Sequence, residues 1–284
     1  MDSITTAHGY RYASIRFVFY SELGMYMLNR RMFQRGKDNN FFWFHEQSNI
    51  FFHVKVYLCY IKENSMTVNE AHLIYFSPTH TSKQVAEAIV HGTGIKNVVS
   101  MNLTLQTVEE TVIPTSALAV IVVPVYGGHV APLAMERLES IRGLDTPAVL
   151  VVVYGNRAYE DALLELSDIL KEQGFIPAAA AAVVTEHNIA HVYGTGRPDE
   201  KDKKEMTAFA EAVKEKLKNT AGSTKLSELS IKGNRPYRPY GTLPLKISVS
   251  SACENCGTCI RKCPVQAISR TDAKVTDESA CITC

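Results

Sequence analysis

The sequence has no long hydrophobic run, almost no net charge and no targeting signal. Its longest apolar stretches, near 117–126 and 176–184, have the length of buried strands and fall short of the roughly 18 residues of a membrane helix. The net charge of +1 argues against nucleic-acid binding and against strong adsorption to membranes. The N-terminal region lacks the basic start, apolar core and cleavage site of a signal peptide, so we expect a cytoplasmic protein without a membrane span.

Two nucleotide-binding motifs are also missing. There is no Gly-x-Gly-x-x-Gly and no Walker lysine pattern, which makes a dinucleotide or triphosphate site a weak hypothesis.

With 284 residues, 46% of them hydrophobic and 21% charged, the chain has an ordinary composition and room for two domains. Outside one C-terminal segment the only cysteine is Cys59, which is typical of a small buried thiol.

The other six cysteines lie in that C-terminal segment. The first four have the spacing C-x2-C-x2-C-x3-C and are followed by Pro264, so that three thiolates can hold one cubane iron–sulfur cluster while the fourth serves a second. Zinc is the alternative, since it also takes paired Cys-x2-Cys ligands, but it rarely uses this dense spacing followed by proline. The expected metal ligands are Cys253, Cys256, Cys259, Cys263, Cys281 and Cys284.

This segment resembles the bacterial-type ferredoxins that hold two 4Fe-4S clusters. The resemblance implies that Cys253, Cys256 and Cys259 ligate the first cluster, and that Cys263 serves the second with Cys281 and Cys284. The family pattern has further cysteines after the position of Cys284. We therefore expect that the sequence is cut within the second motif and that the complete protein holds two clusters; a true terminus with one improvised cluster is the alternative.

A second feature is a hydroxyl-rich loop between a strand and a helix. The apolar run Ala71–Phe76 predicts a buried strand, and the helical spacing of Val85, Ala88 and Ile89 predicts a helix over 84–91. Hydroxyl groups and backbone N–H groups at a helix N-terminus can hold a phosphate. An ordinary N-cap cluster is the alternative. The hydroxyls belong to Ser77, Thr79, Thr81 and Ser82, with His80 among them.

Strands and helices continue to alternate after this loop. Further strands are predicted at 97–101, 117–123, 147–153 and 176–184, and helices near 132–141, 160–173 and 198–218. This alternation predicts an α/β fold over residues 66–218, a five-stranded doubly wound parallel sheet. Ligands of such sheets bind at the carboxyl ends of the strands. Two more loops leave strands at that edge, and their candidate residues are Tyr126, Gly127, Gly128, Tyr154, Gly155, Asn156 and Tyr159.

These three loops resemble the FMN-binding loops of flavodoxins. The resemblance implies that the hydroxyl loop holds the FMN phosphate, that Tyr126 or Tyr159 stacks on the flavin ring, and that the glycine loops bring backbone N–H groups to its edge. His80 stands where flavodoxins commonly have glycine, and histidine tolerates a positive φ better than most residues.

Three other regions complete the expected organisation. Residues 1–65 hold 15 of the 25 aromatic residues but show no regular period, so no fold is predicted there. They are either an arm that covers the flavin or docks a partner, or, as we favour, an extension upstream of a start at Met66. Residues 219–245 are predicted to be a linker, with docking of the Arg-Pro-Tyr repeat as the alternative. Residues 246–284 are the small ferredoxin-like iron–sulfur domain.

This order resembles a family of fused flavodoxin–ferredoxin proteins. The resemblance implies an electron-transfer protein that passes electrons between 4Fe-4S clusters and FMN and docks redox partner proteins. The alternative is an FMN-dependent reductase of a small acceptor such as a quinone, fed by its own ferredoxin domain. His129, His187 and His191 are the proton donors that such a reductase could use, but isolated histidines are more often packing or surface residues, so no catalytic residue is assigned.

Overall fold

The structure is a computed structural model. It describes residues 6–7, 10–21, 24–34, 41–42, 66–106, 108–241, 245 and 247–284, with side chains from Met66 onward except that of Lys225. The chain divides into two compact units, Met1–Lys62 and Glu63–Cys284. Each unit is described by itself.

The first unit contains an antiparallel sheet that the sequence does not predict. Its strands are β1 (Thr6–Ala7), β2 (Tyr10–Ser21), β3 (Gly24–Gln34) and β4 (Phe41–Phe42), paired in that order. In β2, apolar and aromatic residues occur at both odd and even positions, which hides the alternation of a half-buried strand. The aromatic residues Trp43 and Phe44, and Cys59, lie outside the described residues, and the role of 1–65 stays a prediction.

The second unit is built on a parallel sheet. Its five strands are β5 (Glu70–Tyr75), β6 (Asn97–Asn102), β8 (Ala117–Tyr126), β11 (Thr146–Tyr154) and β12 (Phe175–Val184). They lie in the order β12-β11-β8-β5-β6, and every pair is parallel. The sheet therefore begins with β5, adds β6 on one side of it, and then adds β8, β11 and β12 on the other side. The switch in strand order lies between β5 and β8, which confirms the predicted doubly wound sheet.

The central strands are apolar because both faces of the sheet are covered. All seven residues from Ala117 to Val123 are buried, as are Thr146 to Val153 in β11. The edge strand β6 differs, since Val98 and Val99 are about 39% and 40% exposed. Three short strands were not predicted: β9 (His129–Val130) pairs antiparallel with β8, while β7 (Thr111–Ile113) pairs with β10 (Ile141–Gly143).

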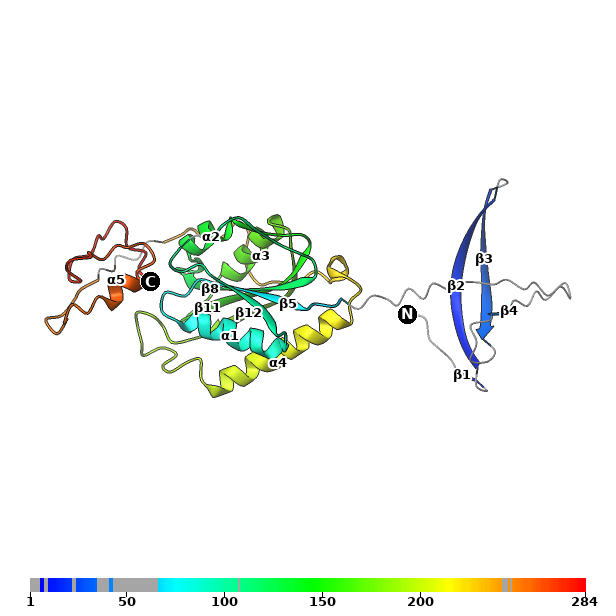
Figure 1. Cartoon of the computed structure of the whole chain (residues 1–284), viewed down its shortest axis with the longest axis horizontal. Coiled ribbons are helices and arrows are strands. Elements are labelled where there is room, and N and C mark those ends of the chain that lie inside the picture. Colours follow the sequence, from blue (N-terminus) through cyan, green and yellow to red (C-terminus); the bar gives the residue numbers. More distant parts are fainter. Residues whose placement is uncertain are drawn as a thin grey trace. The chain divides into compact units, whose positions relative to one another are not determined.

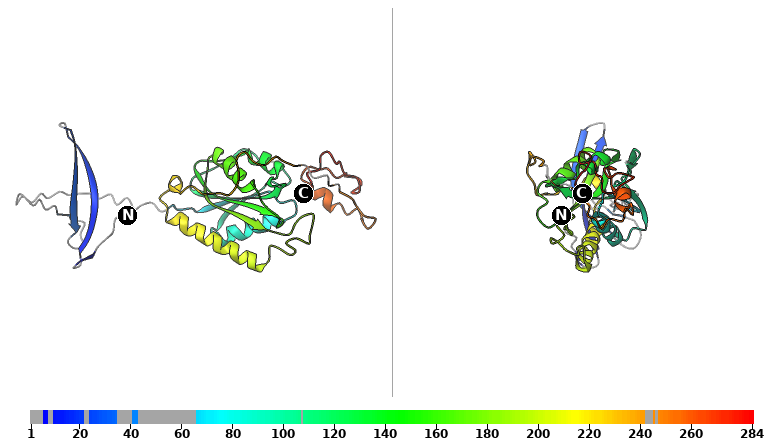
Figure 2. Two further views of the ribbon diagram at one scale, coloured as in Figure 1. Left: turned by 180° about the vertical axis from the view of Figure 1, so that it is seen from behind. Right: turned by 90° about the vertical axis from the view of Figure 1, so that its left-hand side faces the viewer.

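Two helices cover each face of the sheet (Figure 1). Helices α1 (Thr81–Thr93) and α4 (Glu200–Lys218) lie on one face, and α2 (Pro132–Leu138) and α3 (Ala162–Glu172) on the other. Helices α1 and α4 run side by side (Figure 2). Gly92 allows their close approach, because a Cβ atom there would lie 2.7 Å from Cβ of Ala210 and 2.9 Å from Cα of Thr207.

The predicted elements are confirmed with small changes at their ends. The first helix begins at Thr81, within the hydroxyl loop, and the second ends at Leu138, so that Ile141 belongs to β10. After α4 come a 3₁₀ turn, η1 (Ser223–Lys225), and the short helix α5 (Thr258–Lys262). None of the helices among the described residues combines the length and hydrophobicity that crossing a bilayer requires.

Candidate functional site

Two hydrogen bonds of Ser77 hold the hydroxyl loop after β5 in place. The backbone N–H of Ser77 donates to Oγ1 of Thr104 at 2.8 Å, and Oγ of Ser77 accepts the N–H of Lys83 at 3.0 Å. His80 is the N-cap of α1 with φ of 70°, the left-handed backbone expected for the residue at this position, and its side chain caps no N–H. The positive end of the helix therefore faces this loop, where Ser77 caps the N–H of Lys83 in its first turn.

Two of the four predicted hydroxyl residues face a cavity of about 340 Å³. Thr79 and Thr81 line it together with the turn that follows β12, which contributes Glu186 and His187. Ser77 and Ser82 are buried, at 8% and 2% exposure, and do not line this cavity. An anion bound here would meet hydroxyl donors and the helix N-terminus together.

The second predicted loop, Tyr126–Gly128, borders another cavity, of about 260 Å³. Tyr126 and Gly127 line it, and Gly127 and Gly128 have left-handed φ angles of 61° and 90°. The opposite wall comes from the C-terminal cysteine segment, through Cys281 and Thr283. The pKa of Tyr126 is raised well above its ordinary value, first by burial and then by the negative charges of Cys284 and Tyr240.

The turn after β12 connects the two cavities. His187 and Asn188 line both of them. Nδ1 of His187 accepts the N–H groups of Ile189 and Ala190, both at 3.1 Å, which fixes the ring. The ring lies against Gly155, where a Cβ atom would be 2.5 Å from it. The two cavities therefore form one region along the carboxyl edge of the sheet.

The third predicted loop is only partly at this region. Gly155 lies against the ring of His187, which lines both cavities. Tyr154 and Tyr159 instead contact each other edge-to-face, with ring centroids 5.5 Å apart. Asn156 has a left-handed φ of 61°. Tyr159 packs against the core and lines a different cavity, so the structure does not bring it together with Tyr126.

The six cysteines of the C-terminal segment are all free thiols. The pKa of Cys284 is raised to about 11, first by burial and then by the charges of Cys263 and Cys281. Sγ of Cys263 accepts the N–H of Ala267 at 3.2 Å. The pKa of Cys256 is lowered, chiefly by the Thr258 hydroxyl. Within the described part of the chain, no three His, Cys, Asp or Glu side chains stand in a metal-binding arrangement.

A buried arginine joins this cysteine segment to the sheet. The guanidinium of Arg137 in α2, 8% exposed, donates to the carbonyls of Leu103 and Thr104, both at 2.6 Å, and to that of Pro264 at 2.9 Å. Burial lowers the pKa of Arg137. A second contact joins Nζ of Lys262 to Nε2 of His80 at 3.3 Å. The cysteine turn is thus packed beside the hydroxyl loop.

A family comparison identifies the cysteine segment. Residues 249–269 match the family described as 4Fe-4S binding domain. The strand order of the sheet, second-first-third-fourth-fifth, is that of flavodoxins. The chain joins a flavodoxin-like sheet to a 4Fe-4S domain. Among curated proteins, no sequence matches the chain.

Solved structures similar to this chain include two flavodoxins and an oxidoreductase. A flavodoxin from the domain Archaea is 18% identical over 53% of this chain and 99% of its own, with a TM-score of 0.38. The Fusobacterium nucleatum flavodoxin bound to flavin mononucleotide is 14% identical over 52% and 94%, with a TM-score of 0.33. Rubredoxin oxygen:oxidoreductase from Desulfovibrio gigas is 16% identical over 54% and 37%, with a TM-score of 0.40. The fold assignment rests on the strand order.

The segment before the 4Fe-4S domain is docked along α3 and is not a free spacer between residues 231 and 240. Asp161, 3% exposed, accepts the backbone N–H groups of Asn234 and Arg238, both at 2.9 Å. Asp168 accepts two bonds from Arg235, at 2.8 and 2.6 Å, and one from the Tyr237 hydroxyl at 2.6 Å. These contacts attach part of the predicted linker to Asp161 and to α3. We call residues 231–240 the docked segment.

The docked segment should loosen when Asp168 loses its charge. The hydrogen bond from Arg235 is the main cause that lowers the pKa of Asp168 from 3.8. Because the pKa of Asp168 is lowered, the contribution of this carboxylate to docking is present above about pH 4 and is lost as the pH falls. We expect Asp168→Asn to weaken docking by roughly 1 kcal/mol, or about fivefold in local opening. Amide hydrogen exchange of residues 231–240, corrected for intrinsic exchange rates, measures this increase in local opening.

The matched control for Asp168→Asn is Glu172→Gln, an exposed carboxylate on the same helix. It should leave exchange in the docked segment unchanged. Equal acceleration by both variants would show that the ion pair with Arg235 does not hold the segment.

Sequence reasoning missed two contributors to the site. The first is the turn after β12, residues 185–191, in which His187 was considered only as a proton donor. It follows the fifth strand at the same carboxyl edge, so the strand order alone could have included it. The second is Tyr240, whose ring lies 5.3 Å from that of His129 and which lines the cavity of Tyr126. The sequence marked Tyr240 only as part of the Arg-Pro-Tyr repeat.

Proposed function

We propose that the chain transfers electrons between 4Fe-4S clusters, held by its C-terminal cysteines, and an FMN bound at the carboxyl edge of the sheet. One observation carries the proposal: Cys281, Ile282 and Thr283 line the same cavity as Tyr126 and Gly127. Iron–sulfur clusters supply single-electron steps and FMN accepts one or two, while the protein sets their positions and environment.

The residues present fit the phosphate end of FMN. Thr79 and Thr81 offer hydroxyl groups at the N-terminus of α1, where Oγ of Ser77 accepts the N–H of Lys83. Tyr126 and Gly127 would border the ring, with His187 and Asn188 between the two ends. The missing Cβ at Gly155 leaves the room that the His187 ring occupies.

The cysteine thiols are the ligand type that iron–sulfur clusters take. Cys253, Cys256 and Cys259 would hold the first cluster, and Cys263, Cys281 and Cys284 the second. The N–H of Ala267 that bonds Sγ of Cys263 is the kind of contact that tunes cluster potential. Since cysteines with this spacing act as cluster ligands and do not pair as disulfides, we further propose a reducing compartment such as the cytoplasm, with redox proteins as partners.

Purification without oxygen tests the proposal directly. Iron, sulfide and FMN are assayed, and stopped-flow reduction is then followed at separate wavelengths for the flavin and the clusters. We expect both cofactors in the same protein and exchange of electrons between them. A colourless protein that contains zinc, or a brown one that takes up no FMN, would contradict the proposal. Consumption of an added quinone in the same assay would favour the reductase alternative.

Thr81→Val tests the phosphate end of the FMN site. Valine keeps the shape of threonine but removes the hydroxyl, and a hydrogen bond to a charged group is worth about 1.5–3 kcal/mol. We therefore expect FMN to bind at least about tenfold more weakly, as measured by quenching of flavin fluorescence. The control is Thr115→Val, an exposed threonine just before β8 at the opposite edge of the sheet. Equal affinities in the two variants would place the phosphate elsewhere.

A further inference from the structure

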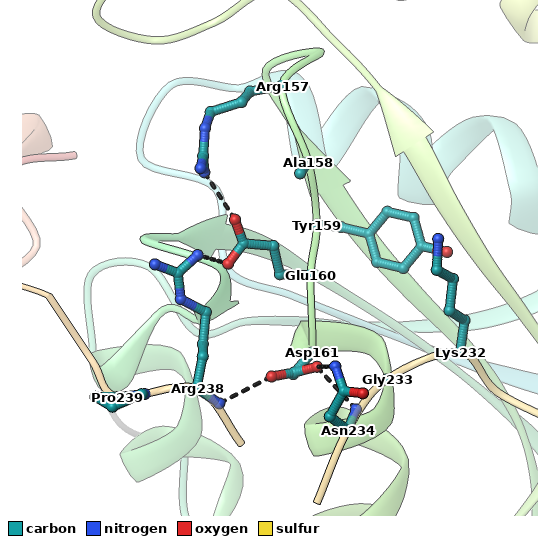
Figure 3. Close-up of a pocket in the computed structure, with 10 residues that line it drawn as sticks. All are labelled: Arg157, Ala158, Tyr159, Glu160, Asp161, Lys232, Gly233, Asn234, Arg238 and Pro239. Atoms are coloured by element: carbon teal, nitrogen blue, oxygen red, sulfur yellow. Dashed lines mark hydrogen bonds and ion pairs between the residues drawn. The ribbon is translucent and has the colours of Figure 1, made fainter. Parts of the chain in front are cut away.

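A separate cavity of about 660 Å³ lies between the turn that precedes α3 and the docked segment (Figure 3). It shares no lining residue with the two cavities at the carboxyl edge of the sheet. Its walls are residues 157–161 on one side and 232–234 and 238–239 on the other. The volume is within the range of small-molecule sites.

Two arginines in this cavity share one carboxylate. Nη1 of Arg157 is 2.9 Å from Oε1 of Glu160, and Arg238 pairs with the other oxygen, so that the carboxylate stands between them (Figure 3). Each guanidinium has five N–H donors, which a single carboxylate cannot engage. The arginine side chains are 73% and 40% exposed. Donors therefore remain open on both arginines.

The remaining charges leave the cavity positive. Asp161 is already engaged by the backbone N–H groups of Asn234 and Arg238. Lys232 forms no hydrogen bond or ion pair with any other residue that the structure describes. Three cations thus face two carboxylates, both of which are occupied.

Glu160 is held in an unusual backbone conformation. Its φ is 46°, in the left-handed region that residues other than glycine seldom adopt. Such residues occur preferentially at ligand-binding and functional sites. Here the conformation places the Glu160 carboxylate between two arginines, where it acts as an internal anion.

We propose that this cavity binds a small phosphate-bearing molecule whose phosphate takes up the open donors of Arg157 and Arg238. The fork of a guanidinium matches phosphate and carboxylate oxygens, and a phosphate carries more negative charge than a single carboxylate. Tyr159 and Pro239 supply a less polar wall for the rest of the molecule. Glu160 competes with the ligand for the arginines. The proposal does not depend on electron transfer or on bound FMN.

Calorimetric titration with inorganic pyrophosphate at low salt tests this site in the full chain. We expect binding that Arg157→Gln weakens by at least about tenfold, since it removes hydrogen bonds to a charged group. Glu160→Gln should strengthen binding several-fold, because it removes the competing charge. Arg157 is mostly exposed, so its replacement leaves the fold intact. Thr81→Val distinguishes this cavity from the hydroxyl loop, since it should weaken pyrophosphate binding only if pyrophosphate binds at the hydroxyl loop.

The control for charge is Arg142→Gln, an exposed arginine on β10. It lies at the other end of α3, where the adjacent Gly143 N–H donates to the carbonyl of Gln173. We expect affinity within about twofold of the unchanged protein. Equal weakening by Arg157→Gln and Arg142→Gln, weaker binding in Glu160→Gln, or no binding at all would overturn the proposal. Tighter binding of citrate than of pyrophosphate would overturn the preference for phosphate.

Discussion

Arg137→Met is expected to lower the free energy of unfolding by about 2–4 kcal/mol, since three buried carbonyls lose a charged donor. The carbonyls belong to Leu103, Thr104 and Pro264, and Arg137 itself is only 8% exposed. Arg137→Lys should recover only part of the loss, because an ammonium group lacks the fork that reaches three acceptors. Urea denaturation followed by circular dichroism measures the change.

Arg142→Met is the matched control, because Arg142 is exposed and only five residues further along the chain. It should change stability by less than about 0.5 kcal/mol, as surface substitutions usually do. The Arg137 variant should also speed proteolysis of the 4Fe-4S domain, since the contact to Pro264 is lost. Similar losses in both variants would mean that the three carbonyls do not depend on Arg137.

Gly92→Val is expected to destabilise the second unit by about 1–3 kcal/mol through overpacking. A Cβ atom at this position would lie 2.7 Å from Cβ of Ala210 and 2.9 Å from Cα of Thr207 in α4. The contact with Thr207 is a backbone contact, so the helices must separate. The free energy of unfolding from urea titration, compared between the two proteins, gives the size of the effect.

A double-mutant cycle localises the effect to the helix contact. Adding Ala210→Gly to Gly92→Val should restore part of the stability, because it removes one of the two overlapping atoms. His91→Val serves as the control, since it introduces the same side chain at the exposed neighbour in α1. If the cycle showed no coupling, strain within α1 alone would explain the loss.

The sheet could be predicted from sequence because each strand carries its own signal. Runs such as 117–123 and 147–153 are almost entirely apolar, as strands covered on both faces must be, and turn residues bracket them. The loop Ser77–Ser82 was located by its place between a strand and a helix. The cysteine motif needed no structural context, because its spacing is itself the ligand pattern.

The contacts that position the 4Fe-4S domain could not be predicted, because they join polar residues far apart in the chain. Nothing about Asp161, the N-cap of α3, or about Asp168 within the helix indicates that they bind residues 234–238. Arg137 likewise looks like an exposed helix residue, and its partner Pro264 is 127 residues away. The antiparallel strands β2 and β3 were missed for a different reason, since their apolar residues do not alternate.

Attachment of the docked segment to α3 sets how often the cysteine segment meets the sheet. From Tyr240 the chain needs only a short tether to reach Cys253. A short tether keeps its two ends at an effective concentration on the order of millimolar. Association of the two domains should therefore be insensitive to dilution, and a 4Fe-4S domain supplied as a separate polypeptide would need comparable concentrations to occupy the same place.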